Sequence, residues 1–215
     1  MSSNFDNRVP ILSTAYSPPI EYFASFINSQ TLLIECCENY QKQTYRNRCH
    51  ILTANGLLPL IIPIVRSSSK YIKDIRIDNS SQWQLKHWRA IFSAYKSSPF
   101  FDYYDIYLES LYSRCYNFLF DFNTELLKEI IDLLNLGTQI EYSSSYIDNV
   151  SPSYVDLRSE FNPKKPSVYY KKDMIKYHQV FDHKFGFVSG LSIIDLLFNE
   201  GPMAYNYLES ISKSN

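Results

Sequence analysis

The polar tripeptide Arg46, Asn47 and Arg48 lies in the segment QTYRNRCHILTANG. The segment has the residue types of a β-strand that enters a tight turn, and alternation along a strand would place both arginines on one face and Asn47 on the other. Two guanidinium groups on one face repel each other unless an anion or carboxylates lie between them, and their planar forks suit phosphate and carboxylate groups. The pattern predicts an anion-binding edge, for example for the diphosphate of a nucleotide sugar. The alternative is that the arginines pair with Glu35 or Glu38.

A histidine lies among aromatic residues in the segment WQLKHWRAIFSAY. Trp83, His87, Ile91 and Tyr95 recur every four residues, so they would share one face of a helix. Imidazole has an unperturbed pKa of about 6.5 and can act as a general base. A histidine on an aromatic face is also commonly a core residue that makes one hydrogen bond. His87 is therefore a candidate catalytic base, with a core role as the alternative.

A carboxylate interrupts the apolar segment LSIIDLLF. Burying a carboxylate in an apolar helix costs several kcal/mol unless it is paired. Asp195 therefore requires a partner, and we expect an arginine such as Arg46, Arg48 or Arg158. The pair could be purely structural, or Asp195 could move a proton in catalysis.

Two segments of the second half carry further polar side chains. YVDLR contains Asp156 and Arg158, and YHQVF contains Tyr177 and Gln179. These residues are compatible with holding a polar ligand and with ordinary hydrogen bonding in loops. The signatures GxGxxG, GxxxxGKS/T, GxSxG and HExxH are absent, and the four cysteines have no zinc-finger spacing. The sequence therefore indicates no metal site, and it leaves any cofactor unknown.

The elements that position these side chains follow from hydrophobic periodicity and turn residues. Residues 9–14 and 31–37 are apolar, strand-like runs on either side of a helical pattern at 19–28. This order favours a parallel pair of strands. An Asn-Gly pair between apolar runs at 46–52 and 57–65 predicts a β-hairpin.

The rest of the chain changes in character from strand to helix. Apolar and charged residues alternate over 71–77, which predicts a half-exposed strand. Residues 138–172 are polar and are predicted to be loop, apart from a strand in TQIEYSSSY. Helices are predicted at 80–98, 100–115, 120–137, 190–201 and 203–211. The expected fold class is α+β, or mixed α/β: an N-terminal strand-helix-strand unit and the hairpin form a mixed sheet, and a largely helical C-terminal half packs on it.

Length and composition restrict the function classes. The chain has 215 residues, of which 45% are hydrophobic, so we expect one domain over residues 1–215. A formal net charge of −1 argues against a protein that grips nucleic acid through phosphates. The sequence shows no signal peptide and no apolar run near the ~20 residues that span a membrane. We therefore expect a cytoplasmic protein with reduced thiols and no membrane insertion.

Five segments, taken in order, resemble the WbqC-like family of bacterial proteins. They are AYSPPIEYF, YRNRCHI with the following NG, HWRAIFSAYKSSPFF, YHQVF and LSIIDLLFNEG, and they extend through nearly the whole chain. The family is linked by genome context to O-antigen, surface-polysaccharide and nucleotide-sugar pathways. The resemblance implies an enzyme that modifies a polysaccharide or nucleotide sugar, for example by transferring an acyl or aminoacyl group, with a sugar nucleotide or another anionic small molecule as partner. The alternative is a non-catalytic module that binds a metabolite or a protein.

The resemblance and the residue chemistry together select the candidate site. Many members of the family have Gln-Pro where Ser13-Thr14 stand here. If that glutamine contacts the ligand, the alternative is that this branch binds a different ligand or has lost its activity. The predicted catalytic residues are His87 and Asp195. The predicted substrate-binding residues are Tyr16, Arg46, Asn47, Arg48, Tyr95, Arg158 and Gln179. Pro99 is also singled out by the resemblance.

Overall fold

A parallel sheet of four strands is the first structural unit of the protein. The computed structural model describes residues 8–66, 69–165 and 175–213. The strand order is β5-β2-β1-β6, and every pairing is parallel. The strands are β1 (Val9–Ser13), β2 (Thr31–Glu35), β5 (Gln139–Tyr142) and β6 (Tyr154–Asp156). The predicted parallel pair β1–β2 is confirmed, since Ile11 lies opposite Leu33.

The edges of this sheet differ in how far the sequence predicts them. β5 lies within the strand predicted in TQIEYSSSY. β6 falls in the stretch predicted to be loop, and that prediction is wrong at this point. Three residues are too few for a period-2 pattern to show, and β6 pairs only with β1 as an edge strand. The position of β6 beside β1 is important for the site. The chain adds β2 and then β5 on one side of β1, and it then crosses the sheet to add β6 on the other side of β1.

The predicted hairpin and the mixed α/β class are confirmed, but the hairpin forms a second sheet of its own and does not join the parallel strands in the one mixed sheet that we predicted. Strands β3 (Arg48–Thr53) and β4 (Gly56–Ile61) pair antiparallel, with Thr53 opposite Gly56. Gly56 has φ of +103°, a conformation that the turn requires and that favours glycine. β3 begins two residues later than predicted, so Arg46 and Asn47 lie in the preceding turn and the predicted alternation of Arg46, Asn47 and Arg48 on one strand is wrong.

The helices account for most of the remaining chain. The predicted strand at 71–77 is wrong, because the segment instead forms a short 3-10 helix (Ile72–Asp74) with isolated bridges around it. The predicted helix at 19–28 shortens to α1 (Ile20–Ala24). The four-residue helix α5 (Asp182–Phe185) was not predicted. The other predicted helices are confirmed as α2 (Trp83–Tyr95), α3 (Phe101–Tyr112), α4 (Leu119–Leu133), α6 (Ile193–Glu200) and α7 (Ala204–Lys213).

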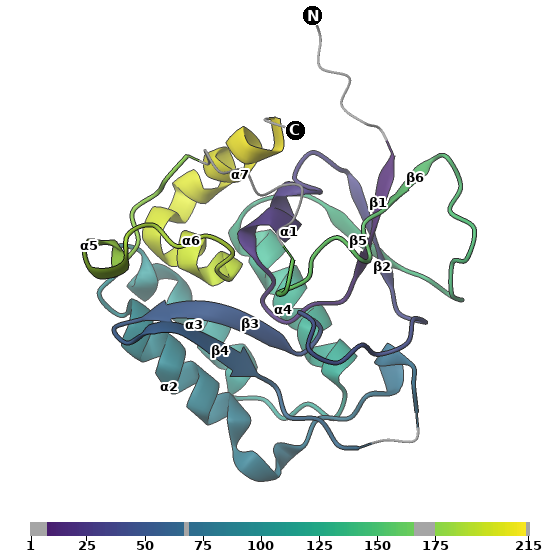
Figure 1. Ribbon diagram of the computed structural model, residues 1–215, viewed down its shortest axis with the longest axis horizontal. Helices are drawn as coiled ribbons and strands as arrows, with labels where there is room; N and C mark the ends of the chain where they lie inside the picture. The colour runs from purple at the N-terminus through teal and green to yellow at the C-terminus, as the bar shows by residue number, and fades with distance from the viewer. Residues whose placement is uncertain (1–7, 67–68, 166–174, 214–215) are drawn as a thin grey trace, which may run out of the picture.

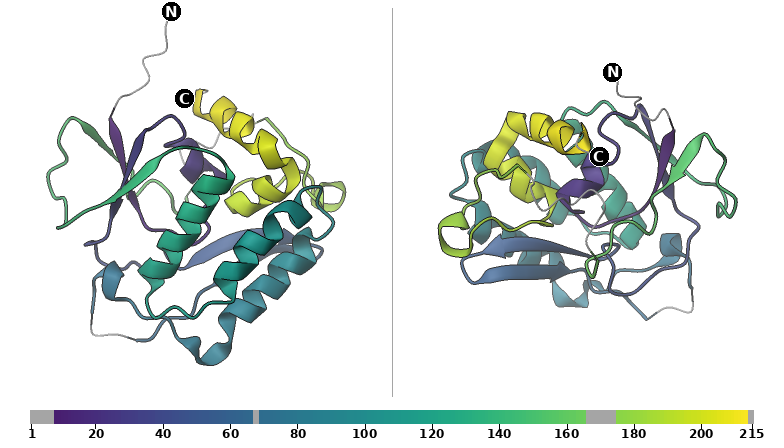
Figure 2. Two further views of the ribbon diagram at one scale, coloured as in Figure 1. Left: turned by 180° about the vertical axis from the view of Figure 1, so that it is seen from behind. Right: turned by 45° about the horizontal axis from the view of Figure 1, so that its top comes forward.

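The helices enclose the space between the two sheets. Figure 1 and Figure 2 show α2 and α3 along the hairpin, α4 between these helices and the parallel sheet, and α1 beside α6 and α7. The predicted face of α2 is confirmed, since Trp83, His87, Ile91 and Tyr95 are all buried. Buried hydrophobic residues of the sheets and helices join in one cluster. This packing leaves the carboxyl ends of the parallel strands next to the hairpin and the loop after β6.

Candidate ligand site at the carboxyl edge of the parallel sheet

The loops that follow β1 and β6 create the setting of the site. In an open parallel sheet, adjacent loops that leave in different directions open a crevice outside the carboxyl ends of the strands. Here that place lies between β1 and β6, because β2 and β5 are on the other side of β1. Ser13 and Thr14 after β1 and Leu157 and Arg158 after β6 line a cavity of about 10 Å³. This volume has room for about one water molecule, so the crevice is nearly filled by side chains.

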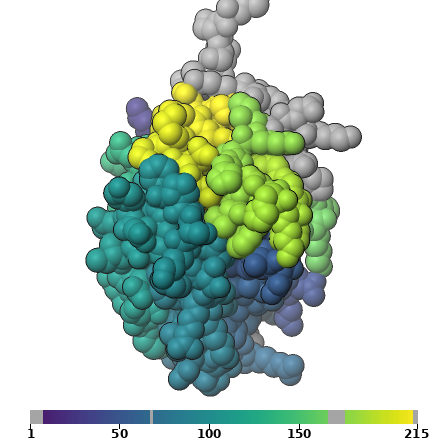
Figure 3. Space-filling view, turned by 90° about the vertical axis from the view of Figure 1, so that its left-hand side faces the viewer, coloured from purple at the N-terminus to yellow at the C-terminus, as the bar shows by residue number. Residues whose placement is uncertain are grey.

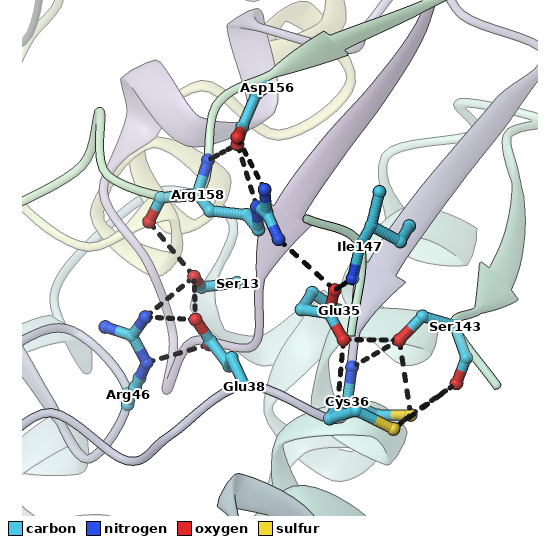
Figure 4. A network of polar contacts seen from close by, with 10 residues as sticks. Ser13, Glu35, Cys36, Glu38, Arg46, Ser143, Ile147, Asp156 and Arg158 are labelled. Carbon is cyan, nitrogen blue, oxygen red and sulfur yellow. Dashed lines mark hydrogen bonds and ion pairs between the residues drawn. The ribbon is translucent and has the colours of Figure 1, made fainter. Parts of the chain in front are cut away.

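One half of the polar network at this edge centres on Arg46 (Figure 4). Its guanidinium donates from Nε to Oε1 of Glu38 at 2.8 Å and from Nη2 to Oε2 at 2.5 Å. Nη2 also donates to the Ser13 hydroxyl at 2.9 Å, and Nη1 donates to Thr44 at 3.3 Å. Both charged side chains are only 6% exposed. Arg46 therefore has the structural pairing with Glu38 that the sequence left as the alternative.

The other half centres on Arg158, which holds two strands of the sheet together (Figure 4). The guanidinium donates from Nε and Nη2 to the Asp156 carboxylate at 2.9 and 2.6 Å and from Nη1 to Glu35 at 3.3 Å. The hydrogen bond from Arg158 lowers the pKa of Asp156. Glu35 is fully buried and also accepts hydrogen bonds from the Ser143 hydroxyl at 2.6 Å and from the backbone of Cys37 and Ile147. Three carboxylates thus surround the two guanidiniums, which are neutralised by the protein itself.

Arg48 has a different environment from these two arginines. It is half-buried at the start of β3, and its Nε atom is buried with no hydrogen-bond partner among residues 8–66, 69–165 and 175–213. Among the described residues, no carboxylate forms an ion pair with it. Its charge contributes, after burial, to the lowered pKa of His50, which follows on the same face of the strand. Of the three predicted arginines, Arg48 has the guanidinium that is available for an anion.

An open cavity of about 410 Å³ adjoins the small one, and the two share Tyr45 and Phe161 in their walls. Its size falls within the range of small-molecule sites. Its wall comes from five parts of the chain: the start of α1, the turn before β3, the hairpin, residues 161–165 and residues 189–190. His50 lies in the wall, and Lys164 and Lys165 lie at the exposed side.

Glu21 is the acidic side chain of this cavity. It lies in the first turn of α1 after Pro18 and Pro19 and is 3% exposed. Burial raises the pKa of the Glu21 carboxyl, and hydrogen bonds from the backbone N–H groups of Glu21 itself and Gly190 partly offset that rise. No described lysine or arginine forms an ion pair with Glu21. A carboxylate with a raised pKa at a cavity wall has the properties of a general base or acid.

The predicted residue His87 lies in the core. Its Nδ1 atom is 2.9 Å from the hydroxyl of Tyr16, which is also 2.9 Å from the hydroxyl of Tyr112. His87 is 7% exposed, and burial lowers its pKa to about 4. The ring is therefore neutral at pH 7. Neither His87 nor Tyr16 is part of the walls of the two cavities at the sheet edge, and their catalytic and binding roles stay predictions.

Among the described residues no arginine pairs with Asp195, and the predicted pairing with Arg46, Arg48 or Arg158 is wrong. Its carboxylate accepts a hydrogen bond from the Tyr177 hydroxyl at 2.5 Å and a longer one from Gln179 Nε2 at 3.4 Å. Gln179 also bonds the backbone N–H and carbonyl of Val188, which ties the segment before α6 to this acid. Burial raises the pKa of Asp195 to about 6. The neutral hydroxyl and amide satisfy the buried acid at lower cost than a second buried charge.

Two further predicted residues also lie inside the protein. Tyr95 is fully buried, and its hydroxyl has no partner at normal hydrogen-bond geometry in the described parts of the chain. Burial raises the pKa of this hydroxyl, and the charge and hydrogen bonding of the nearby Asp195 add to that rise. Asn47 donates from Nδ2 to the carbonyl of Ile62 at 2.9 Å, while its Oδ1 is buried with no partner among the described residues. The structure thus separates the predicted residues into the network at the sheet edge and interior clusters elsewhere.

Sequence reasoning did not select Glu21, Tyr45 or His50. Glu21 interrupts the apolar stretch IEYFASF as Asp195 interrupts LSIIDLLF, so the cost of a buried carboxylate could have identified it. Tyr45 and His50 carry no comparable signal because a strand and a turn accept both residue types. Within the described residues, no cluster of three or more histidine, cysteine, aspartate or glutamate side chains is arranged to hold a metal ion. No helix in the described parts of the chain has the length and apolar character needed to cross a membrane.

Comparisons with known proteins identify a family and one distant relative. The WbqC-like protein family matches residues 14–156 and 146–207. An uncharacterized protein of Mycobacterium tuberculosis (strain ATCC 25618 / H37Rv), Rv1507c, is 27% identical over 232 aligned positions, which cover 94% of this chain and 97% of the relative. No solved structure matches.

Proposed function

Since the chain belongs to the WbqC-like protein family, we propose that it modifies a surface polysaccharide or nucleotide sugar by transferring an acyl or aminoacyl group. The substrate is an anionic small molecule that binds in the 410 Å³ cavity. The observation that carries this proposal is the combination, in one cavity wall, of the buried acid Glu21 with exposed lysines. Glu21 replaces the predicted catalytic residues His87 and Asp195 in this proposal, because neither of those side chains lines this cavity.

The charges near the cavity support an anionic substrate. Lys164 and Lys165 lie at its exposed side, and the guanidinium of Arg48 has no carboxylate partner among the described residues. Lys164 Nζ donates to the Gln43 amide oxygen, a neutral group, at 2.5 Å. A phosphate or diphosphate offers several oxygens to such cations. Arg46 and Arg158 are already occupied, so we assign them to the scaffold.

The acid supports the proton transfer that acyl transfer requires. In that reaction a hydroxyl or amine of the acceptor forms a bond to the acyl carbonyl carbon, the bond to the donor's leaving group breaks, and the acceptor loses a proton. Glu21 takes that proton and returns it to the leaving group. General catalysis of this kind is most effective when the pKa of the base lies near the working pH, and burial moves Glu21 in that direction.

The first test uses purified protein with a panel of nucleotide sugars and acyl donors, with products followed by mass spectrometry. We expect Glu21→Gln to lower kcat by about 10²- to 10⁴-fold, the usual contribution of a general acid or base. We expect it to retain substrate binding, because the amide keeps the shape of the side chain. Glu141→Gln, on the exposed strand β5, is the matched control and should leave kcat unchanged.

Two outcomes would contradict the enzymatic proposal. Full activity in Glu21→Gln would exclude the acid from the reaction. Ligand-dependent thermal stabilisation with no product from any donor would favour a module that only binds a metabolite.

A protein-interaction module is the second candidate, and an exposed apolar face favours it. Phe92 of α2 and Tyr103, Ile106 and Tyr107 of α3 are between 39% and 71% exposed. The helices that carry them form much of the surface in Figure 3. Replacing Tyr103 and Ile106 by serine should leave turnover unchanged if the chain is an enzyme that acts alone.

A further inference from the structure

Two adjacent cysteines converge where the chain leaves β2. Successive side chains of an extended strand point to opposite faces, so neighbouring cysteines are normally far apart. β2 ends at Glu35, and the chain then turns, which brings Sγ of Cys36 within 3.8 Å of Sγ of Cys37. Both residues are half-buried. Cys37 also lines a cavity of about 380 Å³, so small reagents have access to the pair.

The surrounding groups hold the two cysteines in this arrangement. The backbone N–H of Cys36 donates to the Ser143 hydroxyl at 3.1 Å, and that of Cys37 donates to the Glu35 carboxylate at 2.8 Å. Lys73 Nζ lies 4.0 Å from the Cys37 sulfur. Figure 4 shows Cys36 and Ser143 beside Glu35, the carboxylate that also binds Arg158 and accepts from the Cys37 N–H.

We propose that Cys36 and Cys37 form a peroxide-sensitive dithiol site that closes to a reversible disulfide between neighbouring residues. One thiolate attacks the O–O bond of a hydroperoxide and becomes a sulfenic acid, and water or an alcohol leaves. The second thiol attacks the sulfenic sulfur, the S–S bond forms, and a water molecule is released. The two thiols together lose two protons and two electrons, and the peroxide takes them up.

The covalent geometry predicts that this disulfide is easily reduced. Adjacent Cα atoms are about 3.8 Å apart across a trans peptide, which is shorter than the Cα separation of about 4.4–6.8 Å found in ordinary disulfides. The bond is therefore strained, and strained disulfides have the more oxidising potentials of labile, regulatory bonds. Formation of the ring must also shift the Cys37 N–H that donates to Glu35. The redox state of the pair is thereby connected to the network at the sheet edge.

The other two cysteines provide controls within the same chain. Cys115 is exposed and has no neighbouring thiol in the described residues, whereas Cys49 is fully buried. After treatment of the full chain with hydrogen peroxide, we expect peptide mass spectrometry to show loss of two hydrogen atoms from the peptide that contains both Cys36 and Cys37. Dithiothreitol should restore the thiols. We expect the Cys115→Ser variant to react in the same way and Cys49 to remain a thiol.

Single variants separate a dithiol site from two independent thiols. Cys36→Ser and Cys37→Ser should each leave a thiol that stops at sulfenic acid or proceeds irreversibly to sulfinic acid, without recovery of the latter by dithiothreitol. Burial raises the pKa of Cys37, so oxidation should become faster as the pH rises toward the thiolate range. Three results would each overturn the proposal. They are disulfides that form only between molecules, separate sulfinic acids on the two cysteines of the unmodified chain, and a rate of oxidation of the pair that is no higher in the folded chain than in denaturant.

Discussion

Glu21 and Asp195 are two buried acids in the first turns of two different helices. Each lies in the first turn, Glu21 of α1 and Asp195 of α6, and each has its pKa raised by burial. Glu21 forms part of the wall of the open cavity. Asp195 instead accepts hydrogen bonds from Tyr177 and Gln179 in the interior. The two acids thus share burial and a place in the first turn of a helix. They differ in whether the protein or, as proposed for Glu21, a ligand supplies the hydrogen-bond partner of the carboxylate.

The arginines repeat this contrast at the edge of the parallel sheet. Arg46 and Arg158 are saturated by Glu38, Asp156 and Glu35, whereas Arg48 has none of these partners. A charge that the protein already neutralises contributes to stability and to the shape of the site. An unpaired charge next to a cavity is the better candidate for binding. The following predictions test this division, first through the fold and then through the ligand.

The largest effect on stability is expected from Arg46→Met. The substitution leaves Glu38 buried without its cation, and breaking a buried pair in this way costs about 3–5 kcal/mol. The free energy of unfolding in urea measures this cost. The double variant Arg46→Met/Glu38→Leu should recover most of the loss, because neither buried charge remains. If the free energy of unfolding of Arg46→Met lies within about 1 kcal/mol of that of the unmodified protein, the pair contributes no more than a solvent-exposed ion pair. That result would contradict the scaffold role of Arg46.

The next effect is the pH dependence that Asp195 imposes. Its folded pKa of about 6 lies above the unfolded value of about 3.9, so the folded state binds more protons between these values. Stability is therefore highest below the unfolded pKa and falls as the pH rises through about 6. The loss is about 3 kcal/mol for this one group. Asp195→Asn should remove this part of the slope in unfolding measurements between pH 4 and 7, and an unchanged slope would show that the acid is solvated.

A matched pair of substitutions compares the two acids directly. Asp195→Leu leaves the Tyr177 hydroxyl and the Gln179 amide without an acceptor, and each unsatisfied buried group costs about 1–3 kcal/mol. Glu21→Leu deprives the backbone N–H of Gly190, but no described side chain, of a hydrogen-bond acceptor, so we expect it to destabilise the protein by much less. Thermal unfolding at pH 7 compares the two. Equal losses in Tm would mean that Glu21 also belongs to the scaffold.

The smallest effect is expected at Arg48. We expect Arg48→Ala to weaken the binding of pyrophosphate, used as an anionic probe, by about tenfold, in line with a charged hydrogen bond of about 1.5 kcal/mol. Isothermal titration calorimetry measures the change. Lys70→Ala is the control: neither cation lines the 410 Å³ cavity, but the charge of Arg48 acts on the pKa of His50 in its wall, whereas Lys70 is an exposed lysine without this effect. Similar losses in both variants would indicate only a general attraction of the surface for anions.

Local patterns were sufficient for most of the fold. Asn-Gly specified the hairpin, and the four-residue spacing of Trp83, His87, Ile91 and Tyr95 specified the buried face of α2. The three-residue strand β6 and the 3-10 helix at 72–74 were missed because three residues are too few for a repeating pattern to show. Their conformations depend on pairing with distant segments, such as β6 with β1.

The candidate site was predicted less completely than the fold. The sequence identified Arg46, Arg48 and Arg158 as important polar residues, but residue type alone does not distinguish a paired guanidinium from an unpaired one. It also proposed an arginine as the partner of Asp195, whereas a tyrosine and a glutamine occupy that place. Glu21 carried the same signal as Asp195, namely an acid in an apolar segment, and was not selected.

By itself the sequence determined the parallel strand pair, the hairpin and the apolar faces of the helices, because hydrophobic period and turn chemistry act over a few neighbouring residues. Only the tertiary structure decided which charges are neutralised and which acid faces a cavity. Those outcomes depend on contacts such as Ser13 with Arg158 and Glu35 with Arg158, whose partners lie 145 and 123 residues apart. Electrostatic energy falls with distance in space and not along the chain, so the folded arrangement alone assigns each charge its partner.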